Sequence, residues 1–329
     1  MKDIIFQIKG ILSYNRDGSF ATQAKRADIL YQVARELYDN LGFKIKNIYN
    51  LKPQHVEVLV KSWQSRGLSV STIKDKISAL RWLSVKINKP DLIPPDNKSL
   101  GISNRVYVDN INKAIRLSDP ETRERWGRIK NPNIKIQIEL QSKFGLRFEE
   151  SAKFKPWEAD KGDHLYIHYG TKGGRERKIP IRTQEQRELI NRCKSMVKPN
   201  ESMIPSNKTY ASWKNTYHHA MTRAGFTQSE AKGTGHGFRH GYAQDSYTYH
   251  TSHHPDYDNC PDGLSAPITY SSHDEYIEDS ICRIHAENLA HKELVEEIHE
   301  LDHYAREQVN DELGHGRERM DVSAQYLGS

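Results

Sequence analysis

Over residues 22–88, apolar side chains recur every three or four positions, which is the spacing of one face of an α-helix. Three such faces follow one another: Ile29, Val33 and Leu37; then Val56, Leu59, Val60 and Trp63; then Ile73, Ile77, Leu80 and Leu83. Gly67 ends the second stretch, and Ser and Thr side chains before the third can cap its helix. The polar positions in between are rich in Lys and Arg. This pattern predicts a small helical bundle with basic polar faces.

The stretch 88–104 interrupts this pattern with four residues that disfavour helices, namely Pro90, Pro94, Pro95 and Gly101. Such a density of proline is typical of an extended linker. We therefore expect two domains, one over 1–108 that includes the linker and one over 109–329. A length of 329 residues allows two domains that each bury a core.

The second domain combines helical and strand patterns. Residues 134–151 predict a helix that ends in a Gly-containing turn and restarts, and residues 210–226 predict a helix closed by a glycine. Between them, residues 163–181 alternate apolar and polar positions before a Gly-Gly turn and then form a second short β run, which is the pattern of a β-hairpin. The expected fold class is mainly α with a small antiparallel β-sheet (α+β).

An acidic, His-rich insertion is expected at about residues 247–290. From Tyr247 to about residue 272 it contains much His, Asp, Pro, Tyr and Ser without periodicity, so we expect a loop there. Beyond it, helical spacing returns and leads directly into Gly314. The apolar positions of this last helix are Leu294, Ile298, Leu301, Ala305, Val309 and Leu313.

Charge divides the chain into two unequal parts. Residues 1–250 carry 44 Lys and Arg against 25 Asp and Glu, a net of +19, whereas residues 251–329 carry 5 against 18, a net of −13. Each Lys or Arg placed on a phosphate releases a condensed counterion, so the basic part predicts nucleic acid as the partner. The acidic part is expected to face away from that partner.

The sequence lacks the signals of export. No run approaches the ~18 apolar residues of a membrane span, and the first residues do not form a signal peptide. The cysteines Cys193, Cys260 and Cys282 show no paired spacing and fit a reducing compartment. We therefore expect a cytoplasmic protein.

Side chains that could take part in catalysis lie in four short segments. In chain order, the segments contain Arg147 and Glu150; Lys172; His236 and Arg239; and His315 and Tyr326. Each segment alone is unspecific, because an Arg after a Gly turn or a Lys on a hairpin is usually solvated. Their joint occurrence in this order is specific.

With these motifs, the sequence resembles the tyrosine recombinase (phage integrase) family. That family has an Arg after a Gly-Leu turn with an acidic residue three positions on, a Lys on a β-hairpin, His-x-x-Arg, Leu-Gly-His and a nucleophilic Tyr. The resemblance covers most of the chain. It implies a core-binding domain and a catalytic domain that form a clamp around DNA. It also implies site-specific recombination through a 3′-phosphotyrosyl intermediate, for integration or excision of a mobile genetic element.

The resemblance assigns a role to each residue of these motifs. Opening a phosphodiester places extra negative charge on the non-bridging oxygens, which guanidinium groups bind bidentately, and this role falls to Arg147 and Arg239. Tyr326, three residues before the end of the sequence, is the expected nucleophile. A phenol with a pKa of ~10 needs a base, and His236 is the expected base or proton shuttle.

The remaining residues complete the expected scheme. His315 would hydrogen-bond the phosphate, Lys172 would protonate the leaving 5′-oxygen, and Glu150 would orient its neighbours. Because the bond energy is kept in the phosphotyrosine, the scheme needs no metal and no nucleotide cofactor. The sequence has neither a Walker loop nor a carboxylate cluster of the two-metal type.

The resemblance also implies partners and location. We expect double-stranded DNA recombination sites, a homo-tetramer on paired sites, and a monomer or dimer off DNA. Accessory DNA-bending or directionality factors are further expected partners, and no membrane is. The expected location is the nucleoid in a bacterial cytoplasm.

The insertion leaves alternatives open. Its histidines and cysteines could bind zinc, although a metal-free interaction loop is favoured: His250, His253, His254, Cys260, His273, Cys282 and His285. Four tyrosines could stack on bases or pack in a small core, and the local acidity favours packing: Tyr247, Tyr249, Tyr257 and Tyr270. We expect the insertion to contact the next protomer, in place of the C-terminal extension of related recombinases.

Two rival functions also remain at this stage. The chain could be a catalytically idle DNA-binding relative, which the presence of every expected residue type disfavours. It could also be a metalloenzyme built on the insertion, whose activity chelators would remove. Covalent trapping of protein on DNA separates a recombinase from both.

Overall fold

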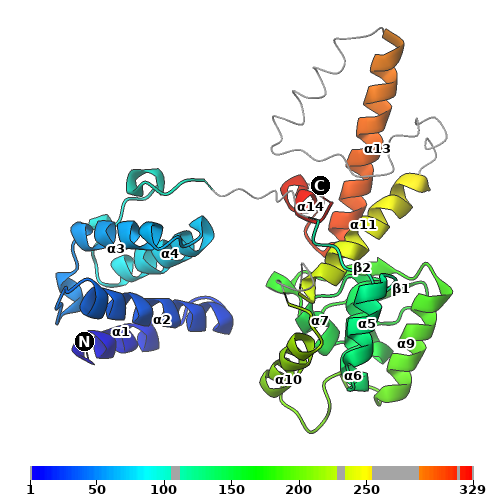
Figure 1. Ribbon diagram of the computed structural model, residues 1–329, viewed down its shortest axis with the longest axis horizontal. Helices are drawn as coiled ribbons and strands as arrows, with labels where there is room; N and C mark the ends of the chain where they lie inside the picture. Colours follow the sequence, from blue (N-terminus) through cyan, green and yellow to red (C-terminus); the bar gives the residue numbers. More distant parts are fainter. Residues whose placement is uncertain (1, 105–111, 228–233, 254–288, 317–318, 328–329) are drawn as a thin grey trace. The chain divides into compact units, whose positions relative to one another are not determined.

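The computed structural model describes the chain except for residues 1, 105–111, 228–233, 254–288, 317–318 and 328–329. The described chain divides into two compact units, Met1–Val106 and Tyr107–Ser329 (Figure 1). Each unit has its own buried apolar side chains. No helix in the described part has the length and apolar character that crossing a membrane requires.

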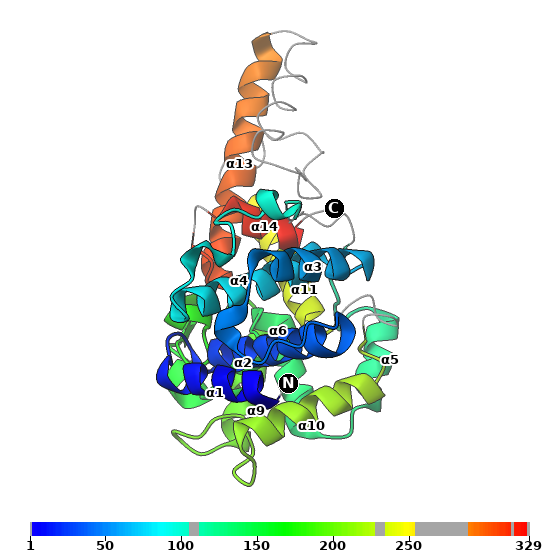
Figure 2. The same ribbon diagram turned by 90° about the vertical axis from the view of Figure 1, so that its left-hand side faces the viewer.

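The first unit is a helical bundle. Its elements are α1 (Lys2–Tyr14), α2 (Phe20–Arg35) with a π-helical continuation (Glu36–Asn40), a 3-10 turn (Ile48–Asn50), α3 (Pro53–Ser65) and α4 (Val70–Lys86). Ser19 and Ser69 cap α2 and α4 by accepting hydrogen bonds from the backbone N–H groups of Thr22 and Thr72. Helix α2 packs against both α1 and α4 (Figure 2). The bundle predicted over 22–88 is confirmed.

Helix α1 is part of the bundle, although its residues lie outside the range predicted from the sequence. Its Ile4 and Ile8 are each 2% exposed and belong to the same core as the residues of α2 and α4. These two residues follow the four-residue spacing of a helix, but the apolar stretch around them is short.

The stretch 88–104, predicted as an extended linker, packs onto the bundle instead. It forms two 3-10 turns, Pro90–Leu92 and Lys98–Leu100, and buries Leu92, Ile93 and Ile102. Arg81 of α4 donates hydrogen bonds to backbone carbonyls of the same stretch. The linker prediction is wrong because prolines prevent a helix without removing the gain from burying the apolar residues between them.

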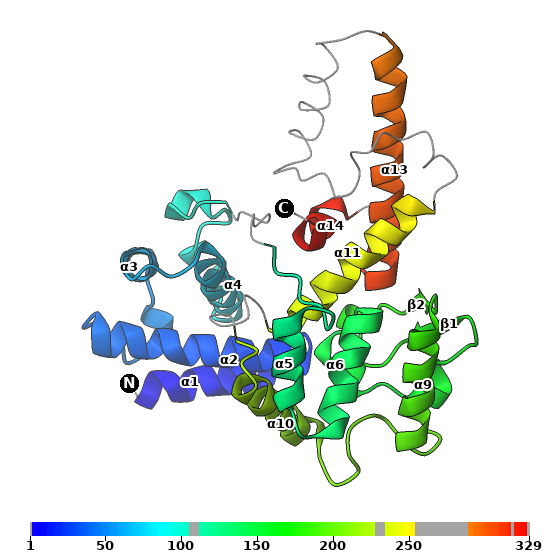
Figure 3. The same ribbon diagram turned by 45° about the vertical axis from the view of Figure 1, so that its right-hand side comes forward.

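The second unit combines helices with a two-stranded hairpin. In chain order its elements are α5 (Pro120–Arg128), α6 (Pro132–Phe144), α7 (Phe148–Ala152), α8 (Pro156–Ala159), β1 (His164–Ile167), β2 (Arg177–Pro180), α9 (Gln184–Met196), α10 (Tyr210–Arg223), α11 (His236–Ser252), α13 (Leu289–Leu313) and α14 (Met320–Leu327). Helix α11 packs against α6, α13 and α14 (Figure 3). The fold is mainly α with a small antiparallel sheet, as predicted.

The predicted hairpin is confirmed. Strands β1 and β2 pair antiparallel, with Leu165 opposite Ile179 and Ile167 opposite Arg177. All four of these side chains are buried. A short 3-10 turn, Lys172–Gly174, lies between the strands.

The loop predicted from Tyr247 begins too early, because α11 continues to Ser252. Tyr247 is 1% exposed, and its hydroxyl donates to Asp302 Oδ1 of α13 at 2.6 Å. Burying an aromatic ring between two helices keeps this turn helical despite its polar neighbours. Tyr247 therefore packs as favoured, whereas Tyr257 and Tyr270 lie outside the described residues. The expected helix after the insertion is confirmed as α13, with Leu301, Ala305, Val309 and Leu313 buried.

Candidate active site

The turn between α6 and α7 presents Arg147. Gly145 ends α6 with φ +59°, and a Cβ at this position would stand 2.5 Å from Cδ1 of Tyr242, so only glycine fits. Arg147 is the N-cap residue of α7, where its backbone N–H donates to Glu150 Oε2 at 2.6 Å. Its guanidinium Nη1 donates to Glu150 Oε1 at 2.8 Å. The carboxylate thus fixes both the backbone and the side chain of Arg147.

Glu150 also binds Arg177 of β2 through two parallel hydrogen bonds of 2.7 Å each. Burial would raise the pKa of Glu150, but the hydrogen bonds and charge of Arg177, with the charges of Arg239 and Arg147, lower it to about 2. The carboxylate is therefore ionised over the physiological range. Arg177 was missed in the sequence, although strand alternation puts it on the same inward face as Ile179. A charged residue on a buried strand face requires a partner.

Arg239, one turn into α11, is fully buried. Its guanidinium donates to the backbone carbonyls of Gly145 and Leu313, and its Nε donates to Tyr326 Oη at 3.3 Å. Burial, chiefly, lowers the pKa of Arg239 to about 10, so it stays charged at neutral pH. Arg239 thereby joins the turn after α6, the end of α13 and helix α14.

Two histidines complete the surroundings of the tyrosine. Tyr326 Oη lies 3.4 Å from His236 Nε2. His315 Nε2 lies 3.4 Å from Arg147 Nη2 and 3.3 Å from Arg239 Nη2. Residues that are 179 positions apart in sequence, from Arg147 to Tyr326, therefore meet in one cluster.

Both of these histidines are poor bases for solvent protons. Desolvation first, and then the charge of Arg239, lower the pKa of His236 and that of His315 to about 3. Each is therefore neutral at neutral pH. A neutral imidazole keeps one ring nitrogen that can accept a hydrogen bond, and His236 Nε2 lies 3.4 Å from the tyrosine hydroxyl.

His240, one turn after His236, is a further residue that sequence reasoning missed. Its ring centroid lies 4.7 Å from that of Tyr326, and it is 9% exposed. The four-residue spacing from His236 was the available signal, because it puts both side chains on one face of α11.

Lys172 lies on the turn of the hairpin, and its side chain is exposed. Its positive charge contributes to the low pKa of His315. Arg175, three residues on, donates from Nη1 to the backbone carbonyl of His315 at 2.6 Å. The structure thus ties the hairpin turn of Lys172 to the turn of His315, while the other six predicted residues lie in or directly beside the cluster around Tyr326.

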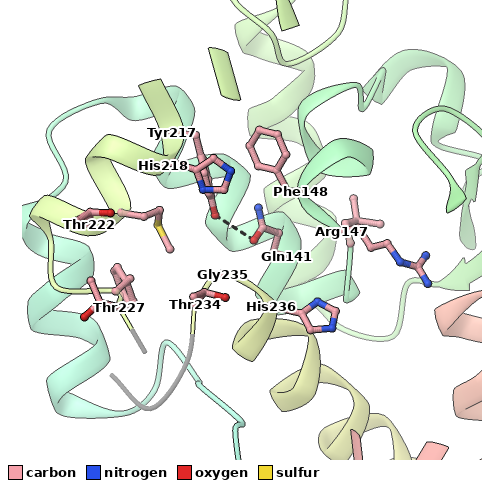
Figure 4. A pocket seen from close by; sticks show the side chains of 13 residues that line it. Gln141, Arg147, Phe148, Tyr217, His218, Thr222, Thr227, Thr234, Gly235 and His236 are labelled. Atoms are coloured by element: carbon pink, nitrogen blue, oxygen red, sulfur yellow. Dashed lines mark hydrogen bonds between the residues drawn. The ribbon is translucent and has the colours of Figure 1, made fainter. Parts of the chain in front are cut away.

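A pocket of about 440 Å³ opens beside the cluster. Figure 4 shows Arg147 and His236 at one end of it and Thr222 and Thr227 at the other. Phe148 and Tyr217 line its wall, and the Tyr217 hydroxyl donates to Gln141 Oε1 at 3.1 Å. The basic cluster is therefore open to a ligand on the side where Arg147 lies.

The described residues contain no group of three or more His, Cys, Asp or Glu side chains arranged to hold a metal ion. Of the residues considered for zinc, His250 binds Glu312 and His253 lies at the end of α11. His254, Cys260, His273, Cys282 and His285 lie outside the described residues.

Comparisons with known proteins agree with this arrangement. Residues 1–89 match the family model described as phage integrase, N-terminal, and residues 121–245 match the model described as integrase. No curated protein matches the sequence significantly.

Several solved structures share the fold. A lambda integrase dimer bound to a core site has a TM-score of 0.59 at 13% identity, covering 99% of this chain and 95% of that one. The Tn1549 transposon integrase in complex with transposon right end DNA has a TM-score of 0.54 at 12% identity, with the same coverages of 99% and 95%. A lambda integrase tetramer bound to a Holliday junction has a TM-score of 0.52 at 16% identity, covering 74% and 69%.

The two matched models cover consecutive parts of the chain, one over the helical bundle and one over the segment that contains Arg147, Lys172, His236 and Arg239. The resemblance inferred from the sequence motifs is thereby confirmed. The chain belongs to the tyrosine recombinase (phage integrase) family.

Proposed function

We propose that the protein is a site-specific DNA recombinase that cleaves and rejoins strands through a 3′-phosphotyrosyl intermediate. The observation that carries this proposal is the position of Tyr326 Oη, 3.4 Å from the neutral imidazole of His236 and 3.3 Å from Nε of the buried Arg239. A nucleophile, a proton acceptor and a fixed positive charge thus share one site.

In the proposed reaction, Tyr326 Oη attacks the scissile phosphorus and its proton passes to His236. The bond from phosphorus to the 5′-oxygen breaks, and Lys172 supplies the proton that this oxygen takes up. Arg147 and Arg239 bind the non-bridging oxygens, on which negative charge increases. His315, between the two guanidiniums, contacts the same phosphate.

Rejoining is the reverse reaction with a different strand. A 5′-hydroxyl attacks the phosphotyrosine, the tyrosine leaves, and a phosphodiester is restored. One phosphodiester is exchanged for another through the phosphotyrosine, so the scheme uses no nucleotide cofactor. Arg147 and Arg239 stabilise the charge on the phosphate, so it uses no metal ion either.

Basic charge supports DNA as the substrate. Residues 1–100 carry 17 Lys and Arg against 9 Asp and Glu, a net of +8. We assign the first unit to core binding and residues 109–329 to catalysis, with both enclosing the duplex. The DNA complexes of related integrases, as dimers and a tetramer, support a homo-tetramer on paired sites. Integration or excision of a mobile element is the proposed task.

The test is covalent trapping on a suicide substrate that carries a nick close to the cleavage site. The wild-type protein should form a protein–DNA band on a denaturing gel, with or without EDTA. Tyr326→Phe should bind DNA equally well and form no such band, because only the hydroxyl is removed. A band with Tyr326→Phe would refute the nucleophile, and loss of the wild-type band in EDTA would refute the metal-independent scheme.

A further inference from the structure

A second buried carboxylate, Glu312, lies three residues before His315, and the proposed reaction does not use it. It is 5% exposed and accepts hydrogen bonds from the Tyr242 hydroxyl at 2.7 Å and the Ser246 hydroxyl at 2.6 Å. Its other partners are the Arg182 guanidinium and His250 Nε2, the latter at 2.8 Å. We call these five residues the Glu312 cluster.

The cluster connects three elements at one point. Arg182 follows β2. Tyr242, Ser246 and His250 lie on consecutive turns of α11, and Glu312 is the penultimate residue of α13. Burial would raise the pKa of Glu312, but its hydrogen bonds with His250 and the charge of Arg182 lower it to about 2. An ionised carboxylate with four partners in a protein interior has one stable position, so it fixes the last turn of α13.

That last turn leads directly to the phosphate-binding groups. The Leu313 carbonyl, next to Glu312, accepts from Arg239 Nη2. Gly314 follows with φ +69°, and a Cβ there would stand 3.0 Å from Arg177 Cδ. His315 therefore has little freedom relative to Glu312.

Tyr242 connects the cluster to the other side of the site. Its ring packs so closely against Gly145 that no Cβ fits there, and Arg147 lies two residues further on. Its hydroxyl reaches Glu312. A single side chain thus spans the turn of Arg147 and the turn of His315.

We propose that Glu312 is a positioning residue: the Glu312 cluster holds the end of α13 so that His315 stands between Arg147 and Arg239. This inference rests on the proposed function. If it is correct, a change at Glu312 affects cleavage only through His315. A purely structural role of Glu312 would affect cleavage whether or not His315 is present.

A double-mutant cycle tests this requirement. Glu312→Gln, His315→Ala and the double variant are compared by the single-turnover rate of covalent trapping at saturating DNA. We expect Glu312→Gln to slow trapping about tenfold or more in the wild-type background and less than about twofold in the His315→Ala background. DNA affinity should stay within about twofold of the wild-type value in every variant. Glu300→Gln, on the exposed face of the same helix, is the matched control and should change nothing.

The outcomes separate the two proposals. Equal slowing in both backgrounds, or no slowing at all, overturns the positioning role while leaving the recombinase intact. No covalent band with the wild-type protein overturns the proposed function and the positioning role with it. Should Glu312→Gln fail to fold, Tyr242→Phe decides, because it keeps the ring against Gly145 and removes only the hydroxyl bound to Glu312. Tyr242→Phe must slow covalent trapping in the wild-type background and must not slow it in the His315→Ala background.

Discussion

Two buried carboxylates in the second unit resemble each other closely, yet their surroundings differ in net charge. Glu150 and Glu312 each have a pKa lowered to about 2, and each binds an arginine. Around Glu150, however, the positive charges of Arg147, Arg177 and Arg239 all act on one carboxylate. Around Glu312, one guanidinium, one imidazole and two hydroxyls surround one carboxylate.

The difference shows how to distinguish a ligand site from an internal anchor. In a charge-balanced cluster, the buried charges and polar groups already have partners within the protein, so no ligand is required to neutralise them. An excess of buried positive charge is unfavourable until an anion arrives, so it marks the place that a phosphate completes. By this criterion the proposed phosphate site lies at the Glu150 region, and the Glu312 cluster supports it.

The largest effect is expected from Arg239→Ala. In the proposed reaction it removes a charge that contacts the transition state, so covalent trapping should slow by about 10³-fold or more. The matched variant Arg182→Met, in the charge-balanced cluster, should slow trapping much less. Single-turnover trapping measures both. Equal losses would abolish the distinction between the two regions.

Glu150→Gln is expected to destabilise the fold strongly. Removing the charge leaves three arginines without their shared counter-ion, so the free energy of unfolding should fall by about 3 kcal/mol. Sulfate should restore part of this loss by occupying the phosphate site. Glu312→Gln should lose less stability, and sulfate should restore none of it. Urea unfolding with and without sulfate provides the measurement, and equal rescue of both variants would contradict the comparison.

Acid should reduce stability in two windows. The pKa values of His236, His240 and His315 in the fold are lowered from 6.5 to about 3, 4 and 3. The unfolded chain therefore binds protons first, and stability declines as pH falls from 6.5. Glu150 and Glu312, lowered from 4.5 to about 2, contribute stability that is present above pH 4.5 and lost as pH falls towards 2.

The measurement for this prediction is urea unfolding of the wild-type protein and His240→Asn between pH 8 and pH 3. The variant should show a shallower decline between pH 6.5 and about pH 4, where the pKa of His240 in the fold lies. A wild-type protein whose stability stays constant from pH 6.5 to pH 4.5 would show that the histidines titrate normally.

The smallest effect is expected from Ser246→Ala. It removes one of four partners of Glu312, so the free energy of unfolding should fall by only about 1 kcal/mol. Ser195→Ala, whose hydroxyl is exposed on α9, is the control and should stay within about 0.5 kcal/mol of the wild-type value. If Ser246→Ala lowered the free energy of unfolding as much as Glu150→Gln, the remaining three partners of Glu312 would not be sufficient to stabilise its carboxylate.

Local patterns in the sequence predicted most of the secondary structure and the members of the site. Alternation around Leu165 and Ile167 predicted the hairpin, and the four motifs predicted the residues that gather at Tyr326. The first signal lies within a few neighbouring residues, and the second is the order of the motifs along the chain. Both can therefore be read from a single sequence.

What remained hidden depends on contacts between distant segments. Arg177 binds Glu150 across 27 positions, and Glu312 binds Tyr242 across 70. Each pair joins segments that are far apart in the sequence, so no local pattern shows that the two residues meet. The buried apolar residues of the proline-rich stretch were overlooked for the same reason, since only the finished bundle offers them a surface.

The nucleophile and the charges beside it belong to one chain, because Tyr326 lies against Arg239 and His236 of its own protomer. Under the proposed chemistry, one protomer therefore holds the tyrosine, the histidine and the arginine for one cut. In the proposed tetramer, exchange between two duplexes would break four strands and use one tyrosine from each of four protomers. In an assembly that mixes Tyr326→Phe with Arg239→Ala subunits, no subunit would have a complete site. In mixtures of either variant with the wild-type protein, the number of cuts would equal the number of wild-type subunits.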